Sequence, residues 1–162
     1  MDSEISKYQR YRQIWLDSLN FLVDAFGCKS SIITFIQMPM LEIFSASDRQ
    51  KGPFLPGKRV NISGHYCEQT YLSRNLLHVA DARAIDQWKD APEIKCGLIS
   101  YIGAPIRQAD GSLFGTLCML DNKENFHQPL ARNGLLQIRS LIESQLQVEA
   151  LSKMDAIEQK KN

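Results

Sequence analysis

The chain has 162 residues, which is enough for one domain with a sizeable core. It has 44% hydrophobic and 23% charged residues, as in an ordinary globular protein, and its formal net charge of +1 provides no strong field for nucleic acid or an anionic membrane. The first residues are polar and acidic, and no apolar run approaches the ~20 residues that span a bilayer. We therefore expect a cytoplasmic domain that has neither nucleic acid nor a membrane as a partner.

The first predicted element is an amphipathic helix over residues 3–26. Apolar side chains recur in it at spacings of three and four, which places them on one stripe: Tyr8, Tyr11, Trp15, Leu19, Leu22 and Phe26. Gly27 is predicted to end the helix, because glycine adopts the left-handed conformation that satisfies the last carbonyl groups.

Two antiparallel strands are predicted next, over 31–37 and 41–45, separated by Met38 and Pro39. Both runs are rich in β-branched and aromatic residues. The segment 48–59 contains two prolines and two glycines, so it is predicted to be a loop. Such a loop either borders a binding site or is a solvated connection.

A helix carrying Cys67 and Tyr71 one turn apart follows, with Ser63 as its predicted cap and Asn75 as its predicted stop. An extended segment over 76–79 comes directly after it.

Short helical turns are predicted in the next segment. Asp86 is the predicted cap of one, and a second covers 93–96 after Pro92, which suits a first helical position. Gly97 is predicted to end the second turn.

A β-hairpin is predicted from 100–107 and 112–121, with Asp110 and Gly111 in its turn. An Asp-Gly pair between two strand-like runs is a strong hairpin signal, because glycine tolerates the positive φ of a tight turn.

Three residues inside these strands interrupt the usual pattern. Gly103 and Gly115 indicate close approach of another backbone or a bulge. Pro105 lacks a backbone donor, so it should face an edge, a bulge or a loop.

A long helix is predicted from residue 129 onward. Its main apolar stripe comprises Leu135, Ile138, Ile142 and Leu146, and a second, offset stripe comprises Leu141, Val148 and Leu151. One stripe can cover the sheet of the domain itself, and the other is available for a second subunit.

The four cysteines, Cys28, Cys67, Cys96 and Cys118, form no Cys-x-x-Cys motif, so we expect buried, reduced thiols rather than a zinc site. The three histidines are too dispersed to predict a metal site.

Together the elements predict an α/β (α+β) sandwich with a central antiparallel sheet. Five segments, 66–68, 77–82, 86–88, 101–106 and 110–121, resemble GAF domains, particularly bacterial ones that precede diguanylate cyclase (GGDEF) or histidine-kinase output domains. The resemblance implies about six strands with helices on both faces, the first and last helices packing together on one face. It implies one domain over 1–155, with 156–162 as the helix end or the start of a linker to an output domain.

The resemblance further implies a sensory or regulatory domain in signal transduction rather than an enzyme. It implies a homodimer through the first and last helices, and a pocket for an unidentified small molecule under the central loops; it identifies no cofactor. The candidate ligand-binding residues are Phe35, Tyr66, Cys67, Tyr71, Trp88, Tyr101 and Cys118. Ordinary core packing is the alternative for each aromatic residue, and a ligand-free dimerisation module is the alternative for the whole chain.

The sequence contains only part of the motif by which some GAF domains bind cyclic nucleotides. Cyclic-nucleotide GAF domains carry Asn-Lys, a Phe and then Asp-Glu; here Asn122, Lys123 and Phe126 are present, but Leu130 and Ala131 stand in place of the acidic pair. The sequence therefore disfavours a cyclic nucleotide.

Tetrapyrrole attachment requires a reactive thiol, for which Cys67 beside His65 and Tyr66 is the candidate. Neighbours on a helix face different directions, so we expect Cys67 to be buried and His65 exposed.

The enzymatic alternative is a free methionine-(R)-sulfoxide reductase, a family with a cysteine near the position of Cys96. Residues 97–99 depart from the pattern of that family, and its acidic substrate ligand before the strand is absent.

Overall fold

The computed structural model describes residues 6–124 and 129–162 and contains one six-stranded antiparallel sheet. The strand order is β3-β2-β1-β6-β5-β4. The strands are β1 (Ser30–Gln37), β2 (Met40–Ala46), β3 (Arg59–Asn61), β4 (Leu77–Val79), β5 (Ser100–Arg107) and β6 (Leu113–Asp121). Because β1 and β6 lie at its centre, the predicted hairpin β5–β6 forms much of the core of the sheet.

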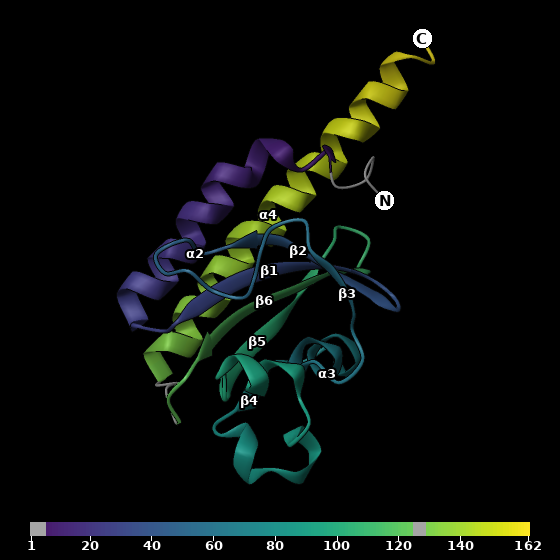
Figure 1. The fold of residues 1–162 in the computed structure, drawn as a ribbon. Helices are drawn as coiled ribbons and strands as arrows, with labels where there is room; N and C mark the ends of the chain where they lie inside the picture. Colours follow the sequence, from purple (N-terminus) through teal and green to yellow (C-terminus); the bar gives the residue numbers. More distant parts are fainter. Residues whose placement is uncertain (1–5, 125–128) are drawn as a thin grey trace.

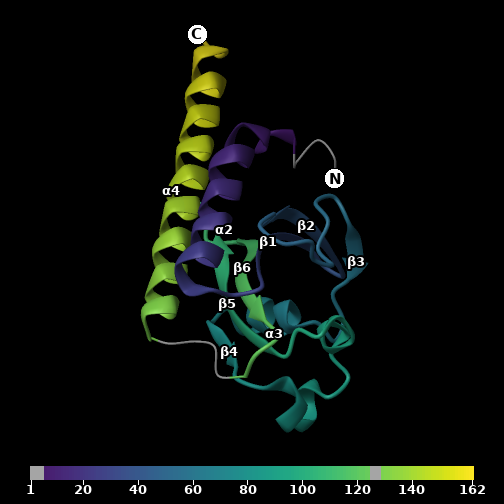
Figure 2. The same ribbon diagram turned by 60° about the vertical axis from the view of Figure 1, so that its left-hand side comes forward.

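Helices cover both faces of the sheet, which confirms the predicted sandwich (Figures 1 and 2). The helices are α2 (Arg12–Phe26), α3 (Tyr66–Ser73) and α4 (Pro129–Gln159), and the 3-10 turns are η1 (Gln9–Tyr11), η2 (Ala82–Ala84), η3 (Asp86–Trp88) and η4 (Pro92–Cys96). Helices α2 and α4 lie side by side on one face, whereas α3 and the turns η2 to η4 lie on the other.

The first helix largely follows the sequence prediction. Trp15, Leu19 and Leu22 are completely buried, and Gly27 ends the helix with a φ of 70° while its N–H donates to the Val23 carbonyl. Within the described residues the helix begins with the 3-10 turn η1; the predicted start at Ser3 lies outside them.

The predicted hairpin is confirmed, and the structure explains the glycine and proline residues within it. Gly111 takes a φ of 85° in the turn. A Cβ on Gly115 would collide with the carbonyl of Thr34 on β1, so here the close approach is to backbone. Strand β4 is short, and its pairing with β5 ends at Gly103. Pro105 lies two residues further along β5, so the missing N–H of Pro105 interrupts no hydrogen bond to β4.

Helix α3 differs from its prediction at both ends. His65 occupies the N-cap position without a side-chain bond, so Ser63 is not the cap. The helix ends at Ser73, and Arg74 rather than Asn75 takes the left-handed conformation, with a φ of 57°.

Two further differences concern the connections. The short strand β3 was not predicted, because its three residues are too few to show a period. Asp86 does not cap η3; instead Asp81 caps η2 by accepting a hydrogen bond from the N–H of Arg83 at 3.0 Å.

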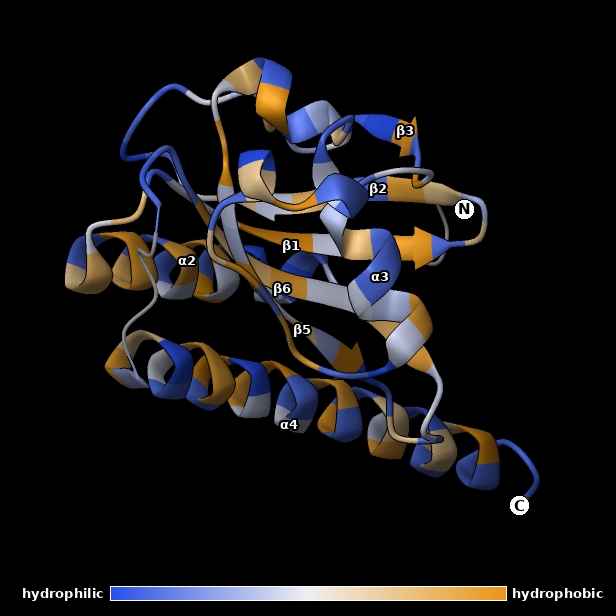
Figure 3. Ribbon diagram, turned by 90° about the horizontal axis from the view of Figure 1, so that it is seen from below, coloured by the Kyte–Doolittle hydropathy of each residue, from blue (hydrophilic) through white to orange (hydrophobic). Residues whose placement is uncertain are grey.

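Each face of the sheet has its own hydrophobic core. The α2 and α4 side is built around residues such as Trp15, Phe114 and Leu135, and the α3 side around residues such as Tyr66, Tyr101 and Cys118. Strands β1 and β6 are buried over nearly their whole length, and in Figure 3 both combine strongly apolar segments with paler, weakly polar ones.

Helix α4 presents both predicted stripes. Leu135, Ile142 and Leu146 are buried against the sheet and α2, whereas Val148 and Leu151 are more than half exposed. The C-terminal turns of α4 extend past the sheet (Figure 3) and contain the exposed apolar residues Met154 and Ile157. None of the described helices combines the length and apolarity needed to cross a membrane.

Candidate functional site

A cavity of about 260 Å³ opens on the α3 face, between the sheet, the β2–β3 loop and the turn η4. Its walls are formed by Ile32, Leu41, Ile43, Pro53, Phe54, Lys58, Val60, His65, Cys67, Pro92, Glu93 and Cys96. The loop over 48–59 therefore borders a cavity, which agrees with the first of its two predicted roles, a border of a binding site rather than a solvated connection. Most of the lining is apolar, with a few polar groups, which is the usual composition of a small-molecule site.

The buried carboxylate of Glu93 is the most unusual group in this wall. Pro92 begins η4 and Gly97 ends it with a φ of 77°, which fixes Glu93 on a short turn. Glu93 is only 6% exposed, and its Oε1 lies 2.8 Å from Nδ1 of His65. Its Oε2 is buried and has no hydrogen-bond partner among the described residues. A buried acceptor without a partner is costly, so this oxygen is the unsatisfied acceptor of the wall.

His65 is held by this carboxylate rather than exposed, which corrects the sequence expectation. Its side chain is 20% exposed, and the hydrogen bond from Glu93 raises the pKa of His65 against the opposing effect of burial. The hydrogen bond to His65 occupies only Oε1 of Glu93, so Oε2 is left as an acceptor.

Lys58 provides the other charge at the cavity. It lies in the exposed β2–β3 connection, and within residues 6–124 and 129–162 no ion pair involves it. The cavity therefore combines an acceptor at its buried wall with a cation in its exposed loop.

Cys67 lines the same cavity from α3 and touches a second thiol behind it. Its Sγ lies 3.5 Å from Sγ of Cys118 on β6, and both residues are buried and free. The hydroxyl of Tyr101 lies 3.2 Å from Sγ of Cys118 and 2.8 Å from Oγ1 of Thr70.

These contacts separate the properties of the two thiols. Hydrogen bonding from Cys118, helped by Thr116 and Tyr101, lowers the pKa of Cys67 despite its burial. Burial raises the pKa of Cys118 and of Tyr101. Cys67 is thus the thiol with more thiolate character.

Most of the predicted ligand-binding residues fill the core instead of lining the cavity. The ring of Tyr66 lies 5.3 Å from that of Trp88 and 5.1 Å from that of Tyr101, and the Tyr66 hydroxyl donates to the Leu98 carbonyl. Tyr71 packs partly buried against the same cluster. Of the predicted residues, Cys67 alone is among those that line this cavity.

Phe35 lies on the opposite face of the sheet. Its ring contacts that of Phe114 at 5.0 Å within the core under α2 and α4. Residues 33 and 35 of β1 point to that core, whereas residues 32 and 36 point to the α3 side. A ligand in the cavity therefore does not contact Phe35.

The sequence analysis missed His65, Glu93 and Lys58 as site residues. Pro92 was identified as a helix start, but nothing local indicates that the next residue is buried against His65, because that contact spans 28 positions.

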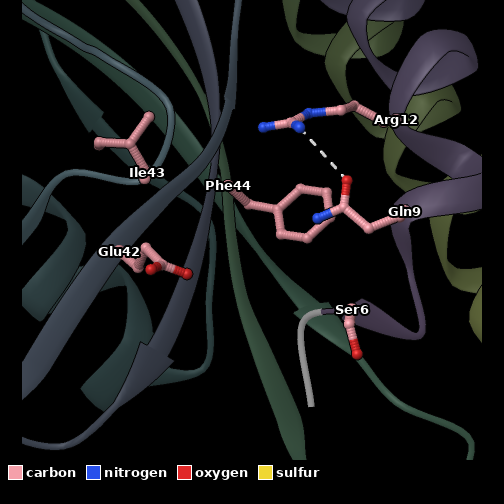
Figure 4. Close-up of a pocket in the computed structure, with 7 residues that line it drawn as sticks. Ser6, Gln9, Arg12, Glu42, Ile43 and Phe44 are labelled. Carbon is pink, nitrogen blue, oxygen red and sulfur yellow. Dashed lines mark hydrogen bonds between the residues drawn. The ribbon is translucent and has the colours of Figure 1, made fainter. Parts of the chain in front are cut away.

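A second cavity, of about 230 Å³, lies between the start of α2 and strand β2 (Figure 4). Its polar groups already have partners: Arg12 donates to Gln9 at 3.3 Å, and Glu42 pairs with Arg59 at 3.0 Å. We therefore place the candidate site at Glu93. In the part of the chain that the structure describes, no three His, Cys, Asp or Glu side chains are arranged to hold a metal ion.

Asn122 and Lys123, the first part of the incomplete cyclic-nucleotide motif, follow β6 directly. Phe126 and His127 lie outside the described residues.

The model of the GAF domain family matches residues 12–143 of the chain. No curated protein matches the sequence significantly. Among solved structures, the chain is similar to a phycoerythrobilin-bound GAF domain from a cyanobacterial phytochrome, with a TM-score of 0.74 and 11% identity over 94% of this chain and 93% of that one. The chain is also similar to the GAF domain of Thermosynechococcus elongatus PixJ in its blue-light absorbing form, with a TM-score of 0.71 and 13% identity over 93% of this chain and 94% of that one.

A free methionine-R-sulfoxide reductase from Neisseria meningitidis, solved with its substrate, is also similar, with a TM-score of 0.71 and 16% identity over 93% of this chain and 86% of that one. At such identities, these similarities establish the fold alone.

Proposed function

Because this chain belongs to the GAF domain family, we propose that it is a sensory domain that binds a small molecule in the cavity beside Glu93. The observation that carries the proposal is the unpartnered, buried Oε2 of Glu93 in a largely apolar wall. A ligand that donates an N–H or O–H to this oxygen would gain a buried, charge-assisted hydrogen bond.

The volume favours a compact ligand. The cavity holds about 260 Å³, below the roughly 300–1,000 Å³ typical of drug-sized ligands. The similar phytochrome domain binds phycoerythrobilin, but here Cys67, the candidate attachment residue, is 4% exposed and in contact with Cys118. A metabolite with a short apolar body and one donor group suits this space better than a tetrapyrrole. The open volume also favours binding over a ligand-free dimerisation module.

A thermal-shift screen of small metabolites on the whole chain tests the proposal. We expect at least one compound to raise the melting temperature, and we expect Glu93→Gln to weaken its binding by roughly 10-fold or more, because the charged acceptor is lost. Glu42→Gln is the matched control, since Glu42 is equally buried but lies at the second cavity. A binder that is equally affected by both substitutions would contradict the assignment.

We further propose that occupancy is transmitted through the terminal helices of a homodimer to an output domain, such as a diguanylate cyclase or histidine kinase of a bacterial cytoplasm. Val148 and Leu151 support a helix-to-helix interface, because they form an exposed apolar stripe. Helix α4 continues through residue 155 to Gln159, so a continuous helix could carry the signal from the domain over 1–155 toward 156–162. A ligand would shift the populations of two helix packings by its different affinity for each.

A thiol enzyme is the second candidate, because Cys96 is exposed and lines the same cavity as Cys67 and Glu93. Glu93 provides a buried carboxylate at the same cavity. If the chain is such an enzyme, it consumes free methionine-(R)-sulfoxide with a thiol donor, and Cys96→Ser abolishes the reaction. The sensory proposal predicts no turnover.

A further inference from the structure

Two buried thiols meet behind the cavity wall, and neither is needed for the ligand contact at Glu93. Cys67 on α3 and Cys118 on β6 have their Sγ atoms 3.5 Å apart. An S–S bond of about 2.05 Å would require an approach of roughly 1.5 Å, within reach of side-chain rotation and a small shift of α3.

The surroundings give the two thiols different roles. Cys67 lines the cavity and is 4% exposed, whereas Cys118 is completely buried. Thr116 Oγ1 lies 3.4 Å from the sulfur of Cys67, and the Tyr101 hydroxyl lies 3.8 Å from it; both can donate to a thiolate. This arrangement pairs a hydrogen-bonded thiol at the cavity wall with a completely buried thiol in contact with it.

We propose that Cys67 and Cys118 are a redox-active pair that a hydroperoxide entering the cavity oxidises to a disulfide, joining α3 to β6. The proposal is independent of whether a metabolite binds beside Glu93.

The reaction balances without a cofactor. The Cys67 thiolate attacks the outer oxygen of the hydroperoxide, the O–O bond breaks, and the alkoxide or hydroxide that leaves takes up the proton lost by Cys67. The resulting sulfenic acid is attacked by the sulfur of Cys118; the S–S bond forms, the S–O bond breaks, and the departing hydroxide leaves as water with the proton of Cys118. Two thiols lose two electrons and two protons, and the hydroperoxide is reduced to an alcohol, or water, plus water.

The new bond would change the cavity. It would draw Cys67 toward β6 and away from the wall, and it would pull on α3, the helix that carries Cys67. The oxidised and reduced chains therefore present different binding sites.

The test uses the whole chain, hydrogen peroxide and thiol counting after denaturation. The four free thiols should fall to two, and the mass should fall by about 2 Da, because two hydrogens leave when a disulfide forms. Peptide mapping should join Cys67 to Cys118, and dithiothreitol should restore both thiols. A map that joins Cys67 to Cys96, or a chain in which Cys96 alone is oxidised and the other three thiols remain, would overturn the proposal.

Variants separate the pair from the other thiols. In Cys28→Ala/Cys96→Ser the two remaining thiols should still be linked by peroxide; Cys28 is a suitable residue to remove because burial raises its pKa to about 12 and makes it unreactive. Adding Cys67→Ser should abolish the loss of 2 Da. If the double variant is folded by circular dichroism and forms no disulfide, the proposal fails.

Tyr101 acts in this proposal as a positioning residue that donates to the sulfur of Cys67. Tyr101→Phe should slow peroxide oxidation by roughly 3- to 10-fold near neutral pH and move the midpoint of the pH–rate profile upward, because the thiolate loses a donor. If Tyr101 has only a structural role, the midpoint of the pH–rate profile will be the same in Tyr101→Phe as in the unmodified chain. An unchanged midpoint would therefore show that the Tyr101 hydroxyl does not act on the sulfur of Cys67.

Discussion

Two glycines in the central hairpin show how single residues create the interior. Gly115 permits the backbone of β1 to lie against β6, since a Cβ would meet the carbonyl of Thr34. Gly103 has a different reason: a Cβ there would overlap the hydroxyl and ring of Tyr101. The absence of a side chain at Gly103 thus lets Tyr101 lie along its own strand and reach Thr70 and Cys118.

Gly103→Ala should therefore destabilise the fold by about 2–4 kcal/mol, because Tyr101 must leave its buried hydrogen bonds. Gly115→Ala should reduce the stability of the fold by more than Gly103→Ala, because the backbone of β1, rather than a side chain, must move. Gly52→Ala is the control: no atom lies within 4 Å of its Cβ, and its change should stay within about 0.5 kcal/mol. Urea denaturation measures all three, and a Gly103→Ala variant as stable as Gly52→Ala would disprove this explanation.

His65 makes a pH-dependent contribution to stability. Glu93 raises the pKa of His65, so this contribution is complete below the ordinary histidine value of about 6.5 and is lost as the pH rises through the raised pKa. The unfolding free energy lost in His65→Gln should be larger by about 1 kcal/mol near pH 5.5 than near pH 8.5.

His78→Gln provides the comparison for this measurement. Burial lowers the pKa of His78, so the contribution of that residue should change with pH in the opposite direction. Parallel pH profiles for the two variants would be inconsistent with the His65–Glu93 pair.

At the scale of elements, α2 and α4 are joined by polar contacts as well as by their apolar stripes. Trp15 of α2 donates its indole N–H to Gln145 at 2.5 Å, and Arg10 of the preceding turn η1 forms an ion pair with Glu149. The N–H of Arg107 on β5 donates to Glu143 at 3.0 Å, which attaches the same helix to the sheet. These contacts fix which stripe of α4 faces inward.

The two stripes of α4 should consequently respond differently to truncation. Leu146→Ala should lose about 2–5 kcal/mol, because it leaves a cavity beneath the helix. Leu151→Ala should change the stability of the monomer by less than about 0.5 kcal/mol, since its side chain is 61% exposed. Equal losses at low protein concentration would mean that both stripes are buried within one chain.

At the scale of the whole molecule, the sheet separates two kinds of surface. The α3 face carries the cavity and the thiol pair, and the α2 and α4 face carries the exposed apolar stripe that continues along the projecting end of α4 (Figure 1). The buried strands β1 and β6 contact both sides, so a change at one face has a direct packed route to the other.

This arrangement predicts a concentration-dependent dimer. Sedimentation at about 10–100 µM should detect it, and Val148→Glu/Leu151→Glu should shift it to monomer by placing charges in the apolar interface. Ser152→Ala/Lys153→Gln serves as the control on neighbouring, exposed helix positions. A chain that is monomeric throughout this range would remove the support for a dimer through α4.

The sequence by itself determined the elements whose signals are local. The helical stripe with Leu19 and Leu22, the turn glycine at Gly111 and the long stripe with Leu135 and Ile142 each express a period or a backbone requirement that neighbouring residues display together. These elements, with the motif around the hairpin, were sufficient for the sandwich fold and the family.

Only the tertiary structure decided the site. Strand β1 is buried on both faces, so no polar alternation indicates that Phe35 points away from the cavity. The aromatic residues Tyr66 and Trp88 pack on each other because distant segments bring them together. Glu93 meets His65, and Cys67 meets Cys118, across 28 and 51 positions, respectively. Local patterns specify which segments form, but the burial and partners of a side chain depend on which segments the fold places beside it.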